Sequence, residues 1–539
     1  MFPSLHFDHI KKATASLLAL AITVGPSVTP AFAAPRKVQP NSAVAATATP
    51  IQHLVVIFQE NVSFDHYFGT YPSATNPTGE PQFTATHGTP TVNGLTNTLL
   101  NSNPNLNPNN LSGASNPFRL DRSQAVTPDQ DHDYTAEQQA FDAGLMDLFP
   151  LSTGNGGTAG SEVMGYFDGN TVTGLWNYAQ FFAMSDNSYG TTFGPSTPGV
   201  INLISGQTNG ALVATNGGDE TTGGPDGSLT VIGDPDPYGD VCSNPSRDQV
   251  RMGATNIGDL LNAAGVTWGS FMGGFNLSTI NSNGTSGCHR SSAGLAGTTG
   301  DYIPHHSFFN YYASTANLAH TRPASLAEVG HAGPANHQYD LQDFFSAAEG
   351  GNLPAVSFLK AQAYQDGHAG YSDPIDEQTF LVNTISFLEA LPAWRNTAVV
   401  IMYDDSDGWY DHQMGPIVNT STGTADALTG PGTCGNAANS LPGLNAVANP
   451  HALGRCGYGP RLPLLVVSPW ARQNFVDHTV TDQSSIIHFI EDNWLAGQRL
   501  PAGSYDALAS SIAQMFDFSK IRSGSHGKLF LDPSTGEPQ

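Results

Sequence analysis

The sequence predicts an α/β fold in which helices cover both faces of one mostly parallel central sheet. Short apolar runs rich in β-branched residues alternate with segments of helical periodicity along the 539 residues, and this alternation is typical of parallel sheets. The run Ala398–Met402 is apolar throughout, as expected for a strand buried on both faces. The 58 glycines and 37 prolines predict long loop insertions. Length alone allows about three domains, but α/β enzymes often grow by insertion.

Five mainly apolar runs are predicted to form strands. Gln52–Phe58 is the first in the chain and leads directly into a polar segment, as Ala398–Met402 does. The other three runs are Val266–Phe271, Leu353–Leu359 and Arg461–Pro469.

Helical segments are predicted between and after these strands. Asp373 and Pro374 provide an N-cap and a favoured first residue for one helix. Its apolar residues at helical spacing are Phe380, Leu381, Ile385 and Leu388. The other predicted helices are a short one within 59–69, Thr135–Leu148, Leu175–Met184, Ile257–Ala264 with Gly265 as its stop, and Ser484–Glu491. The segments 71–130 and 205–255 are predicted to be loop insertions, and 191–199 a turn.

The charge balance excludes some classes of partner. With 19 basic and 45 acidic residues the formal net charge is −26, so a basic face for nucleic acid is not expected. Attachment to anionic membranes through basic patches is disfavoured for the same reason.

The N-terminus has the pattern of a secretory signal. Lys11 and Lys12 precede an apolar run over 13–24, and Ala31-Phe32-Ala33 resembles a cleavage site. That run is too short to span a membrane, and no later segment is long enough for stable insertion. A secreted or periplasmic protein that matures near residue 34 is therefore expected.

The four cysteines suit an oxidising compartment. Their order in the chain suggests the pairs Cys242–Cys288 and Cys434–Cys456, although four cysteines allow three pairings. A CxxC spacing is missing, so a zinc–thiolate site is not expected.

Polar residues follow the predicted strands where a site would form. In open α/β sheets, sites lie at the carboxyl ends of strands, and acid and amide oxygens there suit a hard divalent cation. Histidines could supply charge and a proton to a phosphoryl group. The candidates are Glu60, Asn61, Asp404, Asp405, Ser196, His132, His305, His306 and His368.

Structural roles for the same residues stay open. Asp404 and Asp405 could form a solvated acidic turn, and Glu60 could cap the following helix. Ser196 could be an ordinary turn residue, with Thr197 as a rival nucleophile. His305 and His306 could be satisfied surface histidines near an aromatic cluster.

Four motifs, taken in this order and spacing, resemble a known family. They are Gln59–Gly69, Phe193–Pro198, Tyr403–His412 and Arg461–Trp470. They resemble the bacterial phospholipase C/acid phosphatase phosphoesterases, distant relatives of alkaline phosphatase, over about 51–518. The resemblance implies an alkaline-phosphatase-like fold and a single phosphoesterase catalytic domain over 51–520. This domain would follow a signal peptide at 1–33 and a flexible segment at 34–50, and precede a C-terminal tail at 521–539.

The resemblance also implies roles for the candidate residues. One divalent metal ion, of a kind not specified, is implied on Glu60, Asn61, Asp404 and Asp405. Ser196 matches the nucleophile, which implies a phosphoserine intermediate. The histidines that match positions around the phosphoryl group are His132, His305, His306 and His368.

Three positions depart from the family pattern. Val62 stands where many members have Arg, Asp405 where many have Glu, and Gly199 where the lipase branch has Asn. The expected activity is hydrolysis of phosphate esters, with an acid-phosphatase-like monoesterase placed before a phospholipase C acting on lipid head groups. A non-catalytic secreted binding protein of the same fold is the third alternative. Sulfatase activity is not expected, because Ser196–Val200 lacks the arginine of the sulfatase signature.

Overall fold

The computed structural model describes residues 46–154, 160–215, 220–223, 229–435, 453–501 and 503–539. The predicted signal peptide at 1–33 and most of the predicted flexible segment at 34–50 lie outside these ranges. The described residues from 46 onward belong to one compact unit.

An eight-stranded sheet forms the centre of this unit, in the order β14-β11-β15-β1-β16-β17-β4-β18. In chain order the strands are β1 (His53–Gln59), β4 (Ala183–Ser185), β11 (Trp268–Met272), β14 (Gln338–Asp340), β15 (Val356–Lys360), β16 (Thr397–Tyr403), β17 (Leu464–Val467) and β18 (Phe475–Asp477). Only β17 runs antiparallel to its neighbours. The predicted mostly parallel sheet is therefore confirmed, and all five predicted strands belong to it.

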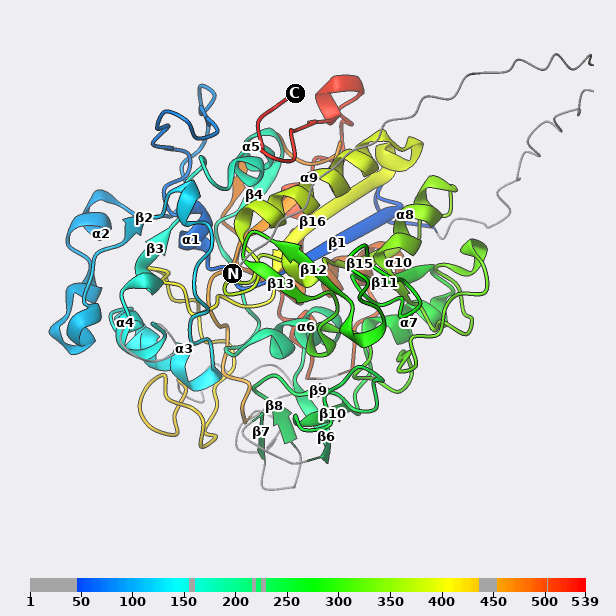
Figure 1. Ribbon diagram of the computed structural model, residues 1–539, viewed down its shortest axis with the longest axis horizontal. Helices are drawn as coiled ribbons and strands as arrows, with labels where there is room; N and C mark the ends of the chain where they lie inside the picture. The colour runs from blue at the N-terminus through cyan, green and yellow to red at the C-terminus, as the bar shows by residue number, and fades with distance from the viewer. Residues whose placement is uncertain (1–45, 155–159, 216–219, 224–228, 436–452, 502) are drawn as a thin grey trace, which may run out of the picture. The chain divides into compact units, whose positions relative to one another are not determined.

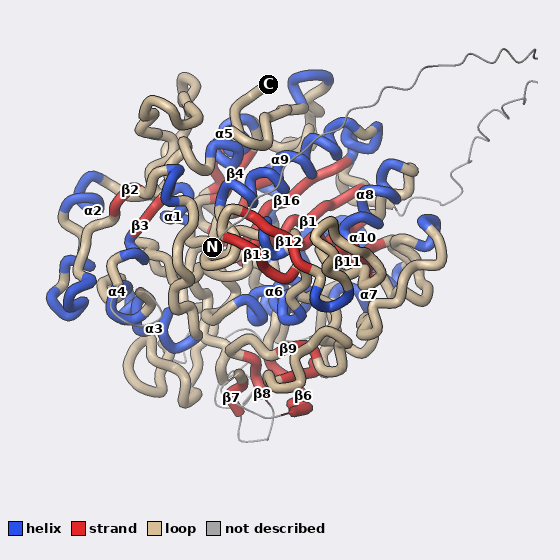
Figure 2. Tube along the Cα trace, viewed as in Figure 1, coloured by secondary structure: helices blue, strands red, loops and turns tan. Residues whose placement is uncertain are grey.

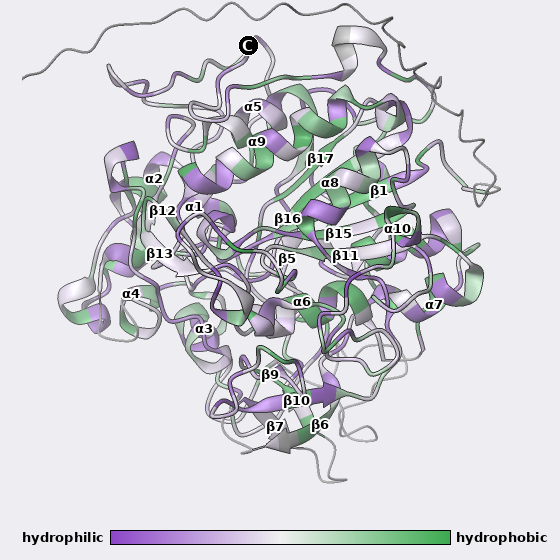
Figure 3. Ribbon diagram, turned by 45° about the vertical axis from the view of Figure 1, so that its right-hand side comes forward, coloured by the Kyte–Doolittle hydropathy of each residue, from purple (hydrophilic) through white to green (hydrophobic). Residues whose placement is uncertain are grey.

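Helices cover the sheet in two groups. One group is α5 (Thr173–Phe181), α8 (Leu341–Glu349) and α9 (Pro374–Ala390), and the other is α6 (Ser196–Ser205), α7 (Ile257–Ala264) and α10 (Ser485–Trp494). Members of each group contact one another, for example α8 and α9 through Phe345 and Phe387. In Figures 1 and 3, α9 lies on one side of β16 and α6 lies on the other. Every residue of β16 is buried, as cover on both faces requires.

Local sequence signals account for the best-predicted helices. The Asp373 side chain accepts hydrogen bonds from the backbone N–H groups of Ile375 and Asp376, so α9 begins where the N-cap and Pro374 predicted. Gly265 adopts a φ of 66° and ends α7 as predicted.

Two predicted helices are too long, and one predicted turn is partly helical. The helix expected over Thr135–Leu148 is α3 (Tyr134–Phe141), which ends because Asp142 adopts a left-handed φ of 40°. The helix expected over Leu175–Met184 stops at Phe181, because the next residues pair as β4 with β17 and β18. Ser196–Gly199, predicted as part of a turn, forms the first turn of α6.

The segment 205–255, predicted to be a loop-rich insertion, contains more regular structure than expected. It holds a second, five-stranded sheet in the order β7-β8-β6-β10-β9 (Figure 1). Its strands are β6 (Asn209–Thr215), β7 (Thr221–Gly223), β8 (Leu229–Val231), β9 (Asp236–Pro237) and β10 (Gln249–Met252). Most are short and polar, so they lack the apolar period from which strands are predicted.

Shorter elements and loops complete the described chain (Figure 2). They include α1 (Phe64–Phe68), α2 (Asn97–Asn101), α4 (Phe149–Ser152), β2 (Phe118–Arg119), β3 (Gly165–Tyr166), β5 (Ser188–Tyr189), β12 (Ser291–Gly294), β13 (Gly297–Gly300) and β19 (Thr481–Asp482). No helix among the described residues combines the length and apolar character needed to cross a bilayer.

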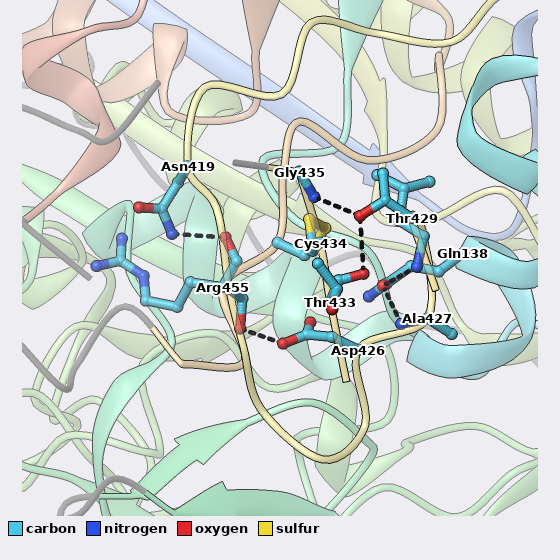
Figure 4. The surroundings of a disulfide bond; sticks show 12 residues. Gln138, Asn419, Asp426, Ala427, Thr429, Thr433, Cys434, Gly435 and Arg455 are labelled. Atoms are coloured by element: carbon cyan, nitrogen blue, oxygen red, sulfur yellow. Dashed lines mark hydrogen bonds between the residues drawn. A yellow bond between two sulfur atoms is a disulfide. The ribbon is translucent and has the colours of Figure 1, made fainter. Parts of the chain in front are cut away.

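Both suggested disulfides are present, Cys242–Cys288 and Cys434–Cys456. Figure 4 shows the second one beside Gln138 of α3, whose Oε1 accepts a hydrogen bond from Ala427 N at 2.8 Å. Cys456 O accepts a hydrogen bond from Phe193 N at 3.0 Å. This disulfide therefore anchors the segment that leads to Ser196.

Candidate active site

The carboxyl ends of three parallel strands bring charged residues to one edge of the sheet. Because β15, β1 and β16 are parallel neighbours, residues that follow them lie together. Glu60 and Asn61 follow β1, Asp404 and Asp405 follow β16, and Lys360 ends β15. All five are at most 2% exposed, so the ionisable groups of the four residues other than Asn61 interact in a poorly solvated environment.

Ser196 meets these carboxylates at the start of α6. Its Oγ lies 3.0 Å from Glu60 Oε2 and 3.2 Å from Asp405 Oδ2. The hydroxyl has one hydrogen and can donate to only one of the two at a time. The Thr197 hydroxyl instead lies 3.3 Å from Tyr311 OH and 3.4 Å from the carbonyl oxygen of His305. Of the two hydroxyls, the one that contacts the carboxylates is therefore that of Ser196.

Asn61 and Asp404 each have a buried side-chain oxygen that accepts no hydrogen bond from the described part of the chain. Asn61 has a left-handed φ of 62°. Its backbone N donates to Asp404 Oδ1 at 3.1 Å, and its side-chain Nδ2 donates to Asp407 Oδ1 at 2.9 Å. Asn61 Oδ1 and Asp404 Oδ2 are buried with no hydrogen-bond partner among the described residues. Since buried acceptors are normally satisfied, these oxygens fit a hard divalent cation.

The candidate histidines form two pairs around this edge. His306 Nδ1 lies 3.1 Å from Glu60 Oε1, and its ring is 4.5 Å from the His305 ring. The His132 and His368 rings are 6.0 Å apart, and His132 Nδ1 is 3.4 Å from Asp407 Oδ1. All four predicted histidines thus lie at or beside the carboxylate cluster.

The environments of these histidines give them different charges. Burial opposes the charging of His132, but the carboxylates of Asp405 and Asp407 outweigh it and hold its pKa well above the usual value. Burial lowers the pKa of His368 to about 4. Burial, with the neighbouring His305, also holds the pKa of His306 well below its usual value. In the absence of a bound ion, these shifts favour the charged form of His132 and the neutral forms of His306 and His368.

The acids are also perturbed. Burial and the charge of Asp404 hold the pKa of Asp405 well above its usual value. Burial likewise raises the pKa of Asp366, which lies near His306 with 4.0 Å between Oδ2 and Nδ1. A nearby cation would offset these shifts. Two groups of side chains in this region could hold a metal ion, Glu60-His306-Asp366 and Asp129-His132-His368.

Lys360 and Glu137 are ionisable residues near the site that sequence reasoning missed. Lys360 directly follows the predicted strand Leu353–Leu359, and a charged residue immediately after a buried strand was the signal that identified Glu60. Glu137 lies in the first turn of α3. Its role depends on contacts with distant segments, which no local pattern predicts.

The chain was compared with known proteins. The sequence model of the Phosphoesterase family matches residues 51–496. The non-hemolytic phospholipase C of Pseudomonas aeruginosa is 25% identical over 539 residues, which cover 95% of this chain and 64% of that protein. Phospholipase C A of Mycobacterium tuberculosis is 24% identical, with coverage of 87% and 78%. The chain thus spans less than two thirds of the Pseudomonas relative.

Among solved structures, murine ectonucleotide pyrophosphatase/phosphodiesterase 5 matches 64% of this chain and 95% of that chain. The two are 12% identical, with a TM-score of 0.29.

Proposed function

Because the chain belongs to the Phosphoesterase family, we propose that it is a secreted, metal-dependent hydrolase of phosphoric esters that acts through a phosphoserine at Ser196. One observation carries the proposal: the Ser196 hydroxyl lies 3.0 Å from Glu60 Oε2 and 3.2 Å from Asp405 Oδ2. These segments are far apart in the sequence, and they meet where the family resemblance requires a nucleophile and its metal ligands.

The metal site of the proposal consists of Glu60, Asn61, Asp404 and Asp405. A divalent ion bound there would supply positive charge that favours the ionised hydroxyl and neutralises phosphoryl oxygens. The unpartnered buried oxygens of Asn61 and Asp404 support this assignment.

The residues of the chain account for the proton transfers. Ser196 Oγ attacks phosphorus while its proton passes to Asp405 Oδ2, which lies 3.2 Å from Oγ. The bond from phosphorus to the leaving oxygen breaks, and charged His132 gives that oxygen a proton. His132 then takes a proton from a water molecule, whose oxygen attacks the phosphoserine. The bond from phosphorus to Ser196 Oγ breaks, phosphate departs, and Asp405 returns its proton to Ser196 Oγ.

We propose phosphomonoester hydrolysis as the first candidate activity and phospholipase C activity as the second. Charged His132 and the other three histidines would give the several negative oxygens of a monoester one positive charge and several hydrogen-bond donors. The names of the relatives favour the phospholipase C. Secretion rests on the N-terminal signal pattern and two disulfides.

The test is to compare wild type with Ser196→Ala on p-nitrophenyl phosphate and on p-nitrophenylphosphorylcholine. The variant is expected to lose at least about a thousandfold in kcat, as happens when a covalent nucleophile is removed. Thr197→Ser is the matched control and should stay within about tenfold of wild type. Substantial turnover by Ser196→Ala would overturn the nucleophile. Wild-type turnover of the diester alone would reverse the order of the two substrate classes.

A further inference from the structure

Lys360 places an ammonium group inside the carboxylate cluster. It is the last residue of β15 and is 1% exposed. Its Nζ pairs with Glu60 Oε1 and lies 3.8 Å from Asp404 Oδ2. The aliphatic stem brings Nζ to 5.7 Å from the centre of the Phe58 ring. An ammonium held this deeply is stable only beside negative charge.

The oxygens that face Lys360 are those left over by other contacts. Glu60 Oε2 is used by Ser196, which leaves Oε1 for Lys360 and for His306 Nδ1 at 3.1 Å. Asp404 Oδ1 accepts from the backbone N of Asn61 at 3.1 Å and of Asp405 at 2.8 Å. Asp404 Oδ2 therefore remains for the ammonium.

Glu60 and Asp404 are also two of the residues assigned above to a divalent ion. An ammonium near both would repel an incoming metal ion and occupy oxygens that the ion needs. Without metal, the same ammonium offsets the repulsion between the carboxylates. Both effects act in one direction: they stabilise the metal-free site and weaken metal binding.

We propose that Lys360 is the resident counter-ion of the metal site, a positioning residue that holds Glu60 and Asp404 together and competes with the divalent ion for their oxygens. This inference rests on the proposed function. A lysine that merely helped to orient Glu60 for ligation would have the opposite effect, because its removal would weaken metal binding.

The test uses the full-length protein, stripped with EDTA, dialysed and titrated with Mn²⁺ by calorimetry. Lys360→Met keeps the stem and removes the charge, and is expected to bind Mn²⁺ at least about tenfold more tightly than wild type. Its metal-free Tm should fall, and Mn²⁺ should raise its Tm by more than it raises that of wild type. Lys360→Arg keeps the charge and should stay within about threefold of wild-type affinity.

Lys528→Met is the matched control, because this lysine also lies against a phenylalanine ring, with 5.9 Å from Nζ to the centre of the Phe530 ring. Among the described residues, the lysine that pairs with the cluster is Lys360 and not Lys528. Its Mn²⁺ affinity should equal that of wild type. An Mn²⁺ affinity of Lys360→Met equal to or weaker than that of wild type would overturn the counter-ion role but would not contradict the metal site. No Mn²⁺ binding by any of the proteins would overturn both.

A second measurement needs no variant. In a crystal structure of the wild type with Mn²⁺, Lys360 Nζ should lie more than about 4 Å from Glu60 Oε1, beyond ion-pair range. An ammonium still in contact with Glu60 beside the bound ion would overturn the competition.

Discussion

Glu137 joins two loops of the site through a single carboxyl group. Its Oε2 accepts a hydrogen bond from Gly194 N at 2.9 Å, and its Oε1 accepts one from the Ser406 hydroxyl at 2.7 Å. Gly194 lies two residues before Ser196, and Ser406 follows Asp405 directly. Burial raises the pKa of this carboxyl to about 8, so it keeps its proton in neutral solution. The group is thus placed to set the separation of nucleophile and acid rather than to supply charge.

Truncation of this link should affect catalysis more than folding. Glu137→Ala removes both contacts, and a displaced nucleophile should lower kcat by about 10- to 100-fold. Glu137→Gln keeps a neutral group of the same shape and should recover most of that loss. The measurement is kcat and KM on p-nitrophenyl phosphate, with Tm as the control for folding. A Glu137→Ala enzyme with wild-type kcat would exclude the positioning role.

How far single residues could be predicted depends on where their partners lie. Glu60 and Asp404 were identified because each follows a buried strand, and strand ends of a parallel sheet meet at one edge. Ser196 was identified from its resemblance to a family motif. Glu137 was not identified, because a glutamate at the start of a helix is common and carries no functional signal by itself. Its role becomes visible only in the folded structure, where Gly194 and Ser406 contact it.

At the scale of elements, the site depends on how closely α6 approaches β16. Gly199 lies in the first turn of α6, and a Cβ placed there would be 2.4 Å from the carbonyl oxygen of Asp404. No such contact is tolerated in a packed interior. Gln483 Nε2 donates a hydrogen bond to the same carbonyl oxygen. Gln483 Oε1 accepts a hydrogen bond from Thr191 N at 3.1 Å.

Gly199→Ala should therefore separate the nucleophile from its acids. We expect a loss of about 1–3 kcal/mol in the free energy of unfolding, as for other overpacked interior sites, and at least about a tenfold loss in kcat from the shift of Ser196. Urea denaturation and steady-state kinetics measure the two effects. Gly265→Ala is a control for substitution of glycine at a helix terminus. An alanine at this position would be strained by the φ of 66°, but its Cβ would have open space around it. Gly265 also lies far from the site residues in sequence. It should lose stability without a matching loss in kcat.

Elements were predictable where one strong local signal dominates. β16 is apolar from Ala398 to Met402, and α9 has both an N-cap and Pro374. The C-terminal ends of α3 and α5 were predicted too late, because the helical pattern of the sequence continues beyond both. The left-handed conformation of Asp142 ends α3, and the pairing of β4 with β17 ends α5. The small sheet of 209–252 was missed because tertiary pairing, and not an apolar period, holds its short strands.

At the scale of the whole molecule, acidity extends into the interior. The chain has a formal net charge of −26, and several buried carboxyls lie outside the site. Burial raises the pKa of Glu377 to about 8, of Glu491 to about 9, and of Glu389 and Asp482 to about 7. In an unfolded chain these groups titrate near about 4, so the native state retains protons that the unfolded chain has released.

This difference predicts that stability falls as pH rises from about 6.5 to 9. Throughout that window these carboxyls bind more protons in the native state than in the unfolded state, so their contribution favours unfolding with each rise in pH. Histidines with lowered pKa, such as His66 at about 3 and His368 at about 4, act in the opposite sense. They do so only below about pH 6.5, where unfolded histidines become protonated. We expect the free energy of unfolding to drop by about 2 kcal/mol across the window.

Urea denaturation in EDTA at several pH values measures this slope, and Glu389→Gln isolates one contributor. Glu389 Oε1 accepts from Leu529 N at 2.9 Å, a contact that a glutamine oxygen can keep. Because burial raises the pKa of Glu389 to about 7, wild type should lose stability relative to the variant between pH 5 and about pH 7. A wild-type curve that is flat or rising from pH 6.5 to about pH 9 would show that these carboxyls ionise in the native state near their usual values.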